Sequence, residues 1–438
     1  MKIVNSFLIL VTVTVLVSCG LSNDRGELTG VPGRSVWFHP QPFGTIYVPT
    51  GSFHIGQDEQ DILSSQLAPN KQISIVGFYM DDTEITNNEY RQFVYHVVDS
   101  IARETMGETF WIEQENGDHY INYDERLDME DPNAIETLND MFYAESERHY
   151  KVKQLDVRKL KYRYEWVDLV AAAKAPRKGY DANRADFIRK AGEKTNDDSG
   201  VEIYPDTLVW VRDFTYSFNE PMTRMYFWHP KYDNYPVVGV NWRQATAFCN
   251  WRTMHMNTYY GKIDEPIVEP FRLPTEYEWE YAARGGRDGN MYPWGSPYIR
   301  NSKGCFLANF KPGRGDYPSD GGFYPIHVGS YFPNDFGLYD MAGNVAEWTR
   351  TAYQNSTNFF SDDMNSDYEY EAQATKAENP NGDPETLKRK VIRGGSWKDI
   401  GHFINVATRT HEYQDSAKSF VGFRCVMTFM GRSIKDKN

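Results

Sequence analysis

The stretch from Phe336 to Trp348, FGLYDMAGNVAEW, constrains the fold of this chain more than any other segment. Its apolar residues follow neither the period of an amphipathic helix nor the alternation of a strand, and its glycines permit backbone conformations that other residues avoid. We therefore expect a compact, buried loop. The carboxylates of Asp340 and Glu347 then need compensation, because an unpaired buried charge is too costly to keep.

These two carboxylates allow two interpretations. Oxygen ligands that are spread along the loop and interrupted by glycine suit a hard cation such as calcium. Alternatively, the two acids are hydrogen-bonded caps in a turn-rich core. The spacing within the loop does not decide between them.

Composition excludes several classes of protein. The formal net charge is −14 and basic runs are absent, whereas nucleic-acid binding depends on lysine and arginine. The 438 residues contain no linker rich in Pro, Gly and Ser, so one large domain with insertions fits as well as two or three domains. The four cysteines, which include no CxxC pair, argue against a zinc or disulfide scaffold; they are Cys19, Cys249, Cys305 and Cys425.

The N-terminus has the pattern of a bacterial lipoprotein. A short apolar run ends in Leu-Val-Ser-Cys, which matches a lipobox, so residues 1–18 are expected to be a signal peptide and Cys19 to carry the lipid. The alternative is a plain signal peptide cut nearby. Gly20 favours release to the outer membrane, at its periplasmic face. Residues 19–43 are polar and rich in Gly and Pro, as in a tether.

Capping signals predict three helices. Thr86 with Glu89 caps a helix over Glu89 to Val98, and Thr275 with Glu278 caps one that ends at Gly285-Gly286. Asn241 caps a third helix, whose inner face carries Cys249 as a core residue rather than a nucleophile. Alternating and β-branched segments predict a hairpin at Thr45 to Gly56 and strands at Ile73 to Met80, Pro236 to Val240, Val391 to Trp397 and Val421 to Arg424.

We expect the main body to span residues 44–438. Two segments within it differ from the rest in composition. Asp99 to about Tyr235 is charged and rich in tyrosine, and we expect an insertion with its own helices, at Ala134 to Arg148 and Asp156 to Ala173. Gln354 to Thr386 holds eight acids and one lysine, the composition of a solvated loop.

Seven ordered motifs make the sequence resemble the formylglycine-generating-enzyme, or sulfatase-modifying-factor, family. They are GSFHIG with FYMDDTEITNNEY, PVVGVNWRQATAFCNW, FRLPTEYEWEYAARGG, YPWG, NDFGLYDMAGNVAEW, VIRGGSW and GFR. The resemblance implies an α+β, C-type-lectin-like fold with little regular secondary structure, from Gly44 to about Met430, interrupted by the long, partly helical insertion.

The resemblance also implies what chemistry to expect. Active members hold copper with two cysteines, two and seven residues after the aromatic residue of the GGS-aromatic motif. Asp399 and Ile404 stand there in this chain, so neither copper nor catalysis is expected. The calcium ligands of the family map onto Asp340, Gly343, Val345 and Glu347, and, as a second set, onto Asn309, Phe310, Asp320 and Gly322.

A closer resemblance covers nearly the whole chain. The arm RGELTGVPGR, the segment VEIYPDTLVWVRDFTYSFNEPM and the run GCFLANFKPGRGDY are similar to the gliding-motility lipoproteins of the GldK/PorK family. This resemblance implies a ring component of the type IX secretion system that binds a GldN/PorN-type periplasmic protein and works with the GldL/GldM motor. The sister family GldJ is the alternative.

Three classes of function follow from the sequence. The first is a non-catalytic, outer-membrane-anchored scaffold that forms a ring from copies of itself. The second is a formylglycine-generating-type oxidase that uses unusual residues, which the missing cysteine pair disfavours. The third is a lectin-like binder of carbohydrate or peptide.

Overall fold

The computed structural model describes residues 37–56, 70–113, 119–128, 131–175, 183–191, 200–216, 221–313, 318, 321–363, 367–370 and 383–431. The signal peptide, the lipidation site Cys19, most of the tether and the ligand Asp320 therefore lie outside the described residues. The chain divides into two units, of which Gln41–Met430 contains every element below. Within the described part, no helix combines the length and hydropathy needed to cross a bilayer.

The first β elements pair with distant strands and not with each other. β1 (Thr45–Val48) lies antiparallel to β4 (Phe78–Asp81), which also pairs with β15 (Val426–Thr428). β2 (Gly51–Ile55) pairs with β3 (Lys71–Ile75). The predicted hairpin over Thr45 to Gly56 is therefore wrong. The strand expected over Ile73 to Met80 is two strands, because the backbone turns between β3 and β4.

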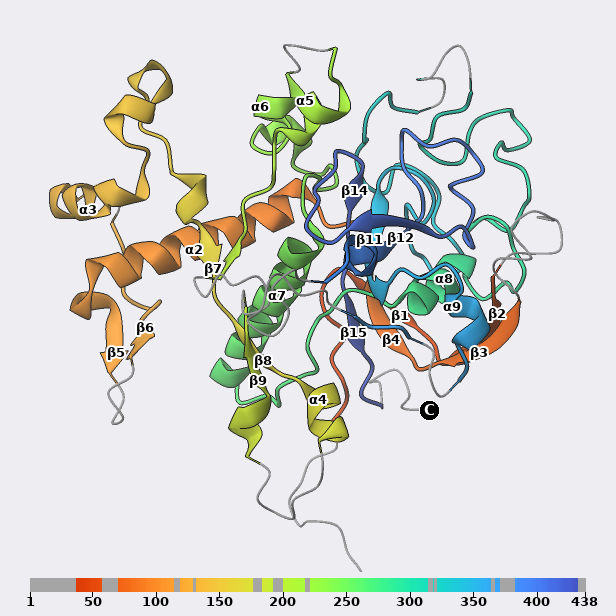
Figure 1. Ribbon diagram of the computed structural model, residues 1–438, viewed down its shortest axis with the longest axis horizontal. Helices are drawn as coiled ribbons and strands as arrows, with labels where there is room; N and C mark the ends of the chain where they lie inside the picture. The colour runs from red at the N-terminus through yellow and green to blue at the C-terminus, as the bar shows by residue number, and fades with distance from the viewer. Residues whose placement is uncertain are drawn as a thin grey trace, which may run out of the picture. The chain divides into compact units, whose positions relative to one another are not determined.

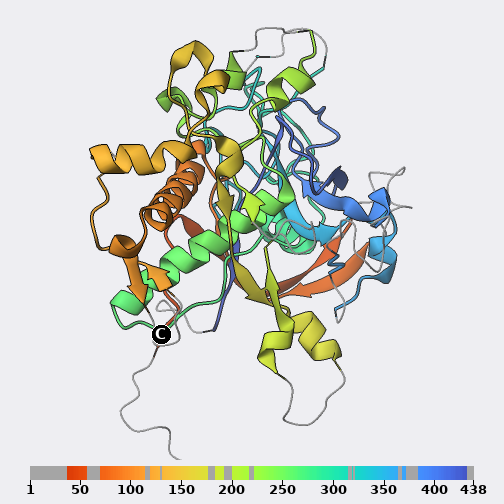
Figure 2. The ribbon, with the colours of Figure 1, turned by 60° about the vertical axis from the view of Figure 1, so that its left-hand side comes forward.

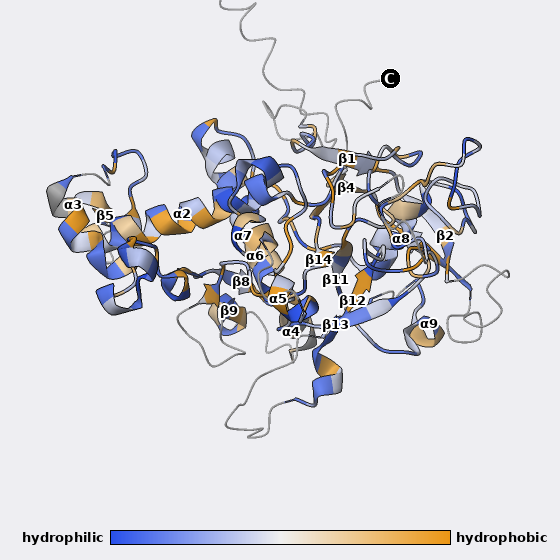
Figure 3. Cartoon of the chain, turned by 90° about the horizontal axis from the view of Figure 1, so that it is seen from above, coloured by the Kyte–Doolittle hydropathy of each residue, from blue (hydrophilic) through white to orange (hydrophobic). Residues whose placement is uncertain are grey.

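A four-stranded sheet contains the end of the Phe336 to Trp348 loop (Figure 1). Its strands, in the order β13-β12-β11-β14, are β13 (Thr410–Tyr413), β12 (Arg389–Arg393), β11 (Ala346–Ala352) and β14 (Val421–Gly422). β11 is parallel to β14 and antiparallel to β12. The two closing strands expected from the sequence are thus present, in shorter form. Hydrophobic colouring in β12 agrees with the full burial of its centre (Figure 3).

All three predicted helices form, and each begins with the predicted cap. α2 (Asn87–Met106), α7 (Trp242–Lys262) and α8 (Glu276–Arg284) all start with a complete capping box. α2 and α7 lie beside each other (Figure 1 and Figure 2), where Tyr90 stacks on Phe248 with ring centroids 5.6 Å apart. Residues 236–240, expected to form a buried strand, are all buried but irregular, with a single bridge at Pro236.

The insertion starts later than expected and contains little helix. α2 extends through Met106, and the two predicted helical runs are broken into short pieces. The described helices and strands are β5 (Trp111–Glu113), β6 (His119–Ile121), α3 (Pro132–Thr137), β7 (Lys161–Tyr162), β8 (Glu165–Val167), α4 (Leu169–Lys174), β9 (Ile188–Lys190), β10 (Val201–Glu202), α5 (Val209–Asp213) and α6 (Met222–Met225). Short 3-10 turns lie at Glu108–Phe110, Leu138–Met141, Glu145–Glu147, His149–Lys151, Val157–Lys159, Arg184–Phe187 and Pro230–Tyr232.

The acidic segment is attached to the body at its beginning. α9 (Thr357–Phe360) buries Thr357 and Asn358, and a 3-10 turn, Glu385–Lys388, precedes β12. The hydroxyl of Tyr277 donates to Asn358 and contacts Ser361, so part of the segment expected to be solvated is packed against α8. The sequence missed this because the packing residues are small and polar.

Candidate functional site

The loop Phe336 to Trp348 is buried as predicted, and it forms one wall of a buried carboxyl cluster. We use this name for Glu84, Asp340 and Glu347 together with the guanidinium of Arg424. The side chains of Glu84, Glu347 and Arg424 have no exposed surface, and Asp340 is 6% exposed. These residues come from three separate segments of the chain, since Asp340 and Glu347 both belong to the Phe336 to Trp348 loop.

Local backbone geometry brings the loop into this cluster. Asp340 and Asn344 both adopt positive φ angles, near 54° and 58°. Gly343 also has a positive φ, and a Cβ there would lie 2.4 Å from the carbonyl oxygen of Asn309. The glycine is therefore required by the close approach of two loops. As a result, Asn344 and Val345 donate to the carboxyl oxygens of Glu84 at 3.1 and 3.3 Å.

Glu347 is fully compensated by protein groups. Arg424 donates from Nε and Nη2 to its two carboxylate oxygens, both at 2.7 Å, and the indole of Trp279 donates at 2.7 Å. The remaining donors of Arg424 reach the carbonyl oxygens of Asp81 and Tyr339. A bidentate guanidinium pair of this kind is among the strongest charge pairs in a protein interior.

Glu84 and Asp340 carry an excess of negative charge. Burial raises the pKa of both groups, and the neighbouring carboxylates raise it further. Three carboxyl groups thus face one guanidinium. A divalent cation would remove this excess, so the donor chemistry fits the calcium site predicted around Asp340, with Glu84 as an additional oxygen donor.

The second predicted set of ligands is partly brought together. The carbonyl oxygen of Asn309 accepts from Asn344, and its side-chain oxygen accepts from the amide of Gly322 at 3.2 Å. Asn309 therefore touches both predicted sites. Phe310 is buried in an aromatic cluster beside them. No three His, Cys, Asp or Glu side chains among the described residues form a metal-binding group, and the calcium assignment stays a prediction.

The two residues that the family resemblance places at the copper-binding positions, Asp399 and Ile404, have local structural roles. The carboxylate of Asp399 accepts from the amide of Ser396 at 3.0 Å and from its hydroxyl at 2.6 Å, which closes the turn after the GGSW motif. Ile404 is fully buried in the core cluster that contains Phe310. Neither side chain offers a soft ligand for copper.

The insertion covers the GGSW motif. The ring of Trp397 stacks on Phe214 at 5.8 Å and on Trp210 at 6.3 Å, with interplanar angles of 16° and 22°. Trp210 is also packed against Tyr226 and Tyr324. Through these contacts, several aromatic residues of the insertion pack onto the main body.

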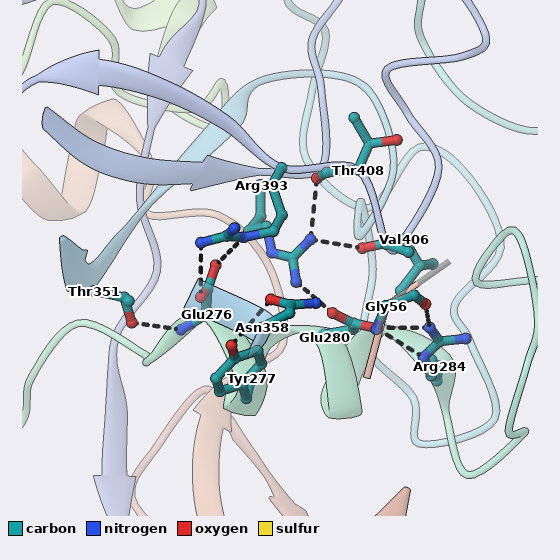
Figure 4. Close-up of polar contacts among 12 residues, drawn as sticks. Gly56, Glu276, Tyr277, Glu280, Arg284, Thr351, Asn358, Arg393, Val406 and Thr408 are labelled. Carbon is teal, nitrogen blue, oxygen red and sulfur yellow. Dashed lines mark hydrogen bonds and ion pairs between the residues drawn. The ribbon is translucent and has the colours of Figure 1, made fainter. Parts of the chain in front are cut away.

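A second group of buried charges fixes α8 against β12 (Figure 4). Glu280 accepts from Arg284 at 2.6 Å and also pairs with Arg393, while Glu276 pairs with Arg409 at 2.7 Å. Arg393 further donates to the carbonyl oxygens of Val406 and Thr408. Both carboxylates are engaged by guanidinium groups, so this network is structural.

The sequence interpretation missed Glu84 and Arg424. Glu84 lies in the motif DDTEITNNEY, where acids at positions 81, 82 and 84 precede the helix cap, and nothing in the spacing separates the buried one from the others. Arg424 lies in VGFRC between apolar residues, and a charged residue in such a run is the signal that could have revealed a buried ion pair.

The fold and these motifs define a domain built like the sulfatase-modifying factors. A model of the sulfatase-modifying factor enzyme 1-like domain matches residues 38–429, and the chain belongs to this family.

Its relatives include both active and inactive proteins. It is 36% identical over 198 residues to inactive C-alpha-formylglycine-generating enzyme 2 of Bos taurus, covering 44% of this chain and 50% of that protein. It is 27% identical over 391 residues to the formylglycine-generating enzyme of Mus musculus, covering 87% and 74%. The chain thus spans about half the length of the inactive relatives it matches. PvdO of Pseudomonas aeruginosa aligns with a TM-score of 0.44 and 16% identity, over 88% of this chain and 94% of that one.

Proposed function

We propose that this protein is a non-catalytic scaffold lipoprotein of the GldK/PorK type. It is lipidated at Cys19, lies at the periplasmic face of the outer membrane, and forms a ring in the type IX secretion system that supports gliding motility. Its partners are further copies of itself and a GldN/PorN-type protein, and the GldL/GldM motor acts on it indirectly. The body keeps the C-type-lectin-like architecture implied by its family.

One observation carries the proposal. The chain keeps the family's buried framework, but the two positions that would bind copper hold Asp399, which closes a turn, and Ile404, which fills the core. These two residues therefore stabilise the fold and do not provide copper ligands for an oxidation reaction. The inactive relatives in the same family are consistent with this role.

Lipidation and ring formation are tested together. The wild-type protein and Cys19→Ala are expressed, fractionated and imaged by electron microscopy with a GldN/PorN-type partner. We expect the wild type in the outer-membrane fraction and in ring-shaped particles, because a tether on one membrane face raises the effective concentration of weak lateral contacts. Membrane association of both forms would contradict the anchor, and particles without rings would contradict the scaffold.

The absence of catalysis is tested directly. The protein is incubated with a Cys-x-Pro-x-Arg peptide, copper and oxygen, and the peptide is analysed by mass spectrometry. We expect no aldehyde, since an aspartate and an isoleucine cannot bind Cu(I) as thiolates do. A catalytically active family member is the positive control. Stoichiometric conversion by this protein would refute the proposal.

A further inference from the structure

A cavity of about 230 Å³ lies between the insertion and the GGSW motif. Its lining residues come from α5, the Asn309 loop, the loop after residue 321 and the GGSW motif; they are Asp213, Phe214, Phe310, Lys311, Gly322, Phe323, Trp397 and Lys398. Four aromatic residues and two lysines thus line one small space. Neither Asp399 nor Ile404 belongs to the lining, but both lie beside it: the amide of Lys311 donates to the carbonyl oxygen of Asp399, and Ile404 packs in the same core cluster as Phe310.

The walls of the cavity are fixed by contacts on the far side. Trp397 is 7% exposed and stacks on Phe214, as described above. The carboxylate of Asp213 accepts from the amide of Ser419 at 3.1 Å and also from its hydroxyl, so this acid is directed at the backbone. The walls formed by Trp397, Phe214 and Asp213 are therefore held by packing and hydrogen bonds.

Lys398 provides the positive charge in the cavity. Its ammonium lies 3.3 Å from the centroid of the Phe420 ring and, among the described residues, forms no ion pair within 4 Å. Burial lowers the pKa of this ammonium, although Asp213 and Asp399 oppose the effect. The nearby carboxylates are already engaged, Asp213 by Ser419 and Asp399 by Ser396. An ammonium in this position has donors available for an anion.

We propose that this cavity binds an organic carboxylate with an apolar, ring-containing body. The aromatic walls take the body by stacking, and Lys398 pairs with the carboxylate, with Lys311 contributing a second positive charge. The volume suits a single ring-bearing residue and not a larger chain. The site exists because the insertion packs over Trp397. The proposed binding does not depend on the scaffold function proposed above.

The test uses the full-length protein in detergent and two probes, N-acetylphenylalanine and its carboxamide. The probes differ in the carboxylate charge alone, and their affinities are measured by calorimetry and by quenching of tryptophan fluorescence. We expect the acid to bind at least about tenfold more tightly than the amide, because a charge-assisted hydrogen bond is stronger than a neutral one by enough to change the affinity about tenfold. Equal affinities, or no binding of either probe, overturn the proposal.

Two variants locate the binding. Lys398→Met keeps the aliphatic stem and removes the ammonium, so we expect the preference for the acid to disappear. Lys303→Met, at an exposed lysine outside the lining, is the matched control and should keep the full preference. A preference that survives in Lys398→Met overturns the assignment. If that variant does not fold, Phe323→Ala is used instead, because the side chain of Phe323 is half exposed. This variant should lower the affinity for both probes by a similar factor, and unchanged affinities overturn the assignment of binding to this cavity.

The source of the carboxylate is distinguished in parallel. A tripeptide with C-terminal phenylalanine is compared with the free N-acetyl acid, and the tripeptide amide is the control. Tighter binding of the tripeptide assigns a peptide C-terminus to the cavity, and tighter or equal binding of the small acid assigns a free organic acid.

Discussion

Within the buried carboxyl cluster, neighbouring acids differ in how their charge is balanced. Glu347 receives two bonds from Arg424 and one from Trp279, which leaves little need for another cation. Asp340 accepts from the amide of Gly329 at 2.6 Å, and Glu84 accepts from Asn344 and Val345. The calcium prediction therefore concerns Asp340 and Glu84 more than Glu347.

The calcium prediction is tested by melting experiments. Calcium at about a hundred times its Kd should add about 2.7 kcal/mol to the unfolding free energy of the wild type, and a chelator should remove it. Asp340→Asn should lose this response, since it removes a charged ligand. Glu385→Gln, an exposed acid paired with Lys388, is the control and should keep it. Identical melting of the wild type in calcium and in chelator would count against a bound ion.

The thiols of Cys249 and Cys425 present a second residue-scale prediction. Their sulfur atoms lie 3.4 Å apart in the core, although the sequence favoured a plain core role for Cys249. We expect diamide, a thiol oxidant, to convert the pair to a disulfide with loss of two hydrogen atoms per molecule. Closing so long a loop should stabilise the fold by up to about 5 kcal/mol. Cys425→Ser should show neither effect. Three free thiols, at Cys249, Cys305 and Cys425, after the wild type is unfolded, refolded and treated with diamide would contradict the pairing.

At the scale of elements, the sequence predicted what depends on local signals. Thr86, Asn241 and Thr275 all cap helices, because a capping box is complete within four residues. Strand pairing failed, since β1 finds its partner more than 30 residues away at β4 and nothing in Thr45 to Gly56 encodes that choice. The candidate site was half predictable for the same reason: Asp340 and Glu347 lie within one motif, whereas Glu84 reaches them only through the tertiary fold.

The cap of α8 gives a prediction on pH. Burial opposes ionisation of Glu278, but Arg272 and the capping contacts of Thr275 outweigh it and hold the pKa of Glu278 below its usual value. A carboxyl whose folded pKa is lowered stabilises the fold above its unfolded pKa, near 4.5, and this contribution is lost as the pH falls through the folded value. Glu278→Gln should therefore cost about 2 kcal/mol at pH near 7.

Denaturant unfolding of both proteins across the acid range measures this effect. The difference between the wild type and Glu278→Gln should shrink below pH 4.5. Glu385→Gln removes an exposed pair and should change stability by less than about 0.5 kcal/mol at every pH. A difference that is constant with pH would assign the cost of Glu278→Gln to packing.

For the whole molecule, the insertion and the acidic segment are the two segments whose composition differs from that of the main body, and their contacts differ. Two acids of the acidic segment are engaged by the body, since Asp363 accepts from Ser74 and Glu369 pairs with Arg350, and a third, Asp383, accepts from Tyr370 within the segment. The charge of this segment is thus partly used in folding. The insertion exposes large aromatic side chains, among them Tyr120 at 59% and Tyr150 at 86%, and the acidic segment exposes Phe359 and Phe360 near its start.

The last prediction compares these two surfaces in ring assembly with a GldN/PorN-type partner. Replacing residues 371–382 by a short Gly-Ser linker should leave folding intact, because the hydrogen bond between Tyr370 and Asp383 holds the two ends of the replaced part close together. Partner affinity should also be unchanged.

The double variant Tyr120→Ser, Tyr150→Ser tests the insertion. It should keep the melting temperature of the wild type but weaken partner binding at least about tenfold, since exposed tyrosines are typical interface anchors. Titration calorimetry and electron microscopy measure both variants. The opposite outcome, loss of rings with the linker variant and normal rings with the double tyrosine variant, would place the partner on the acidic segment instead.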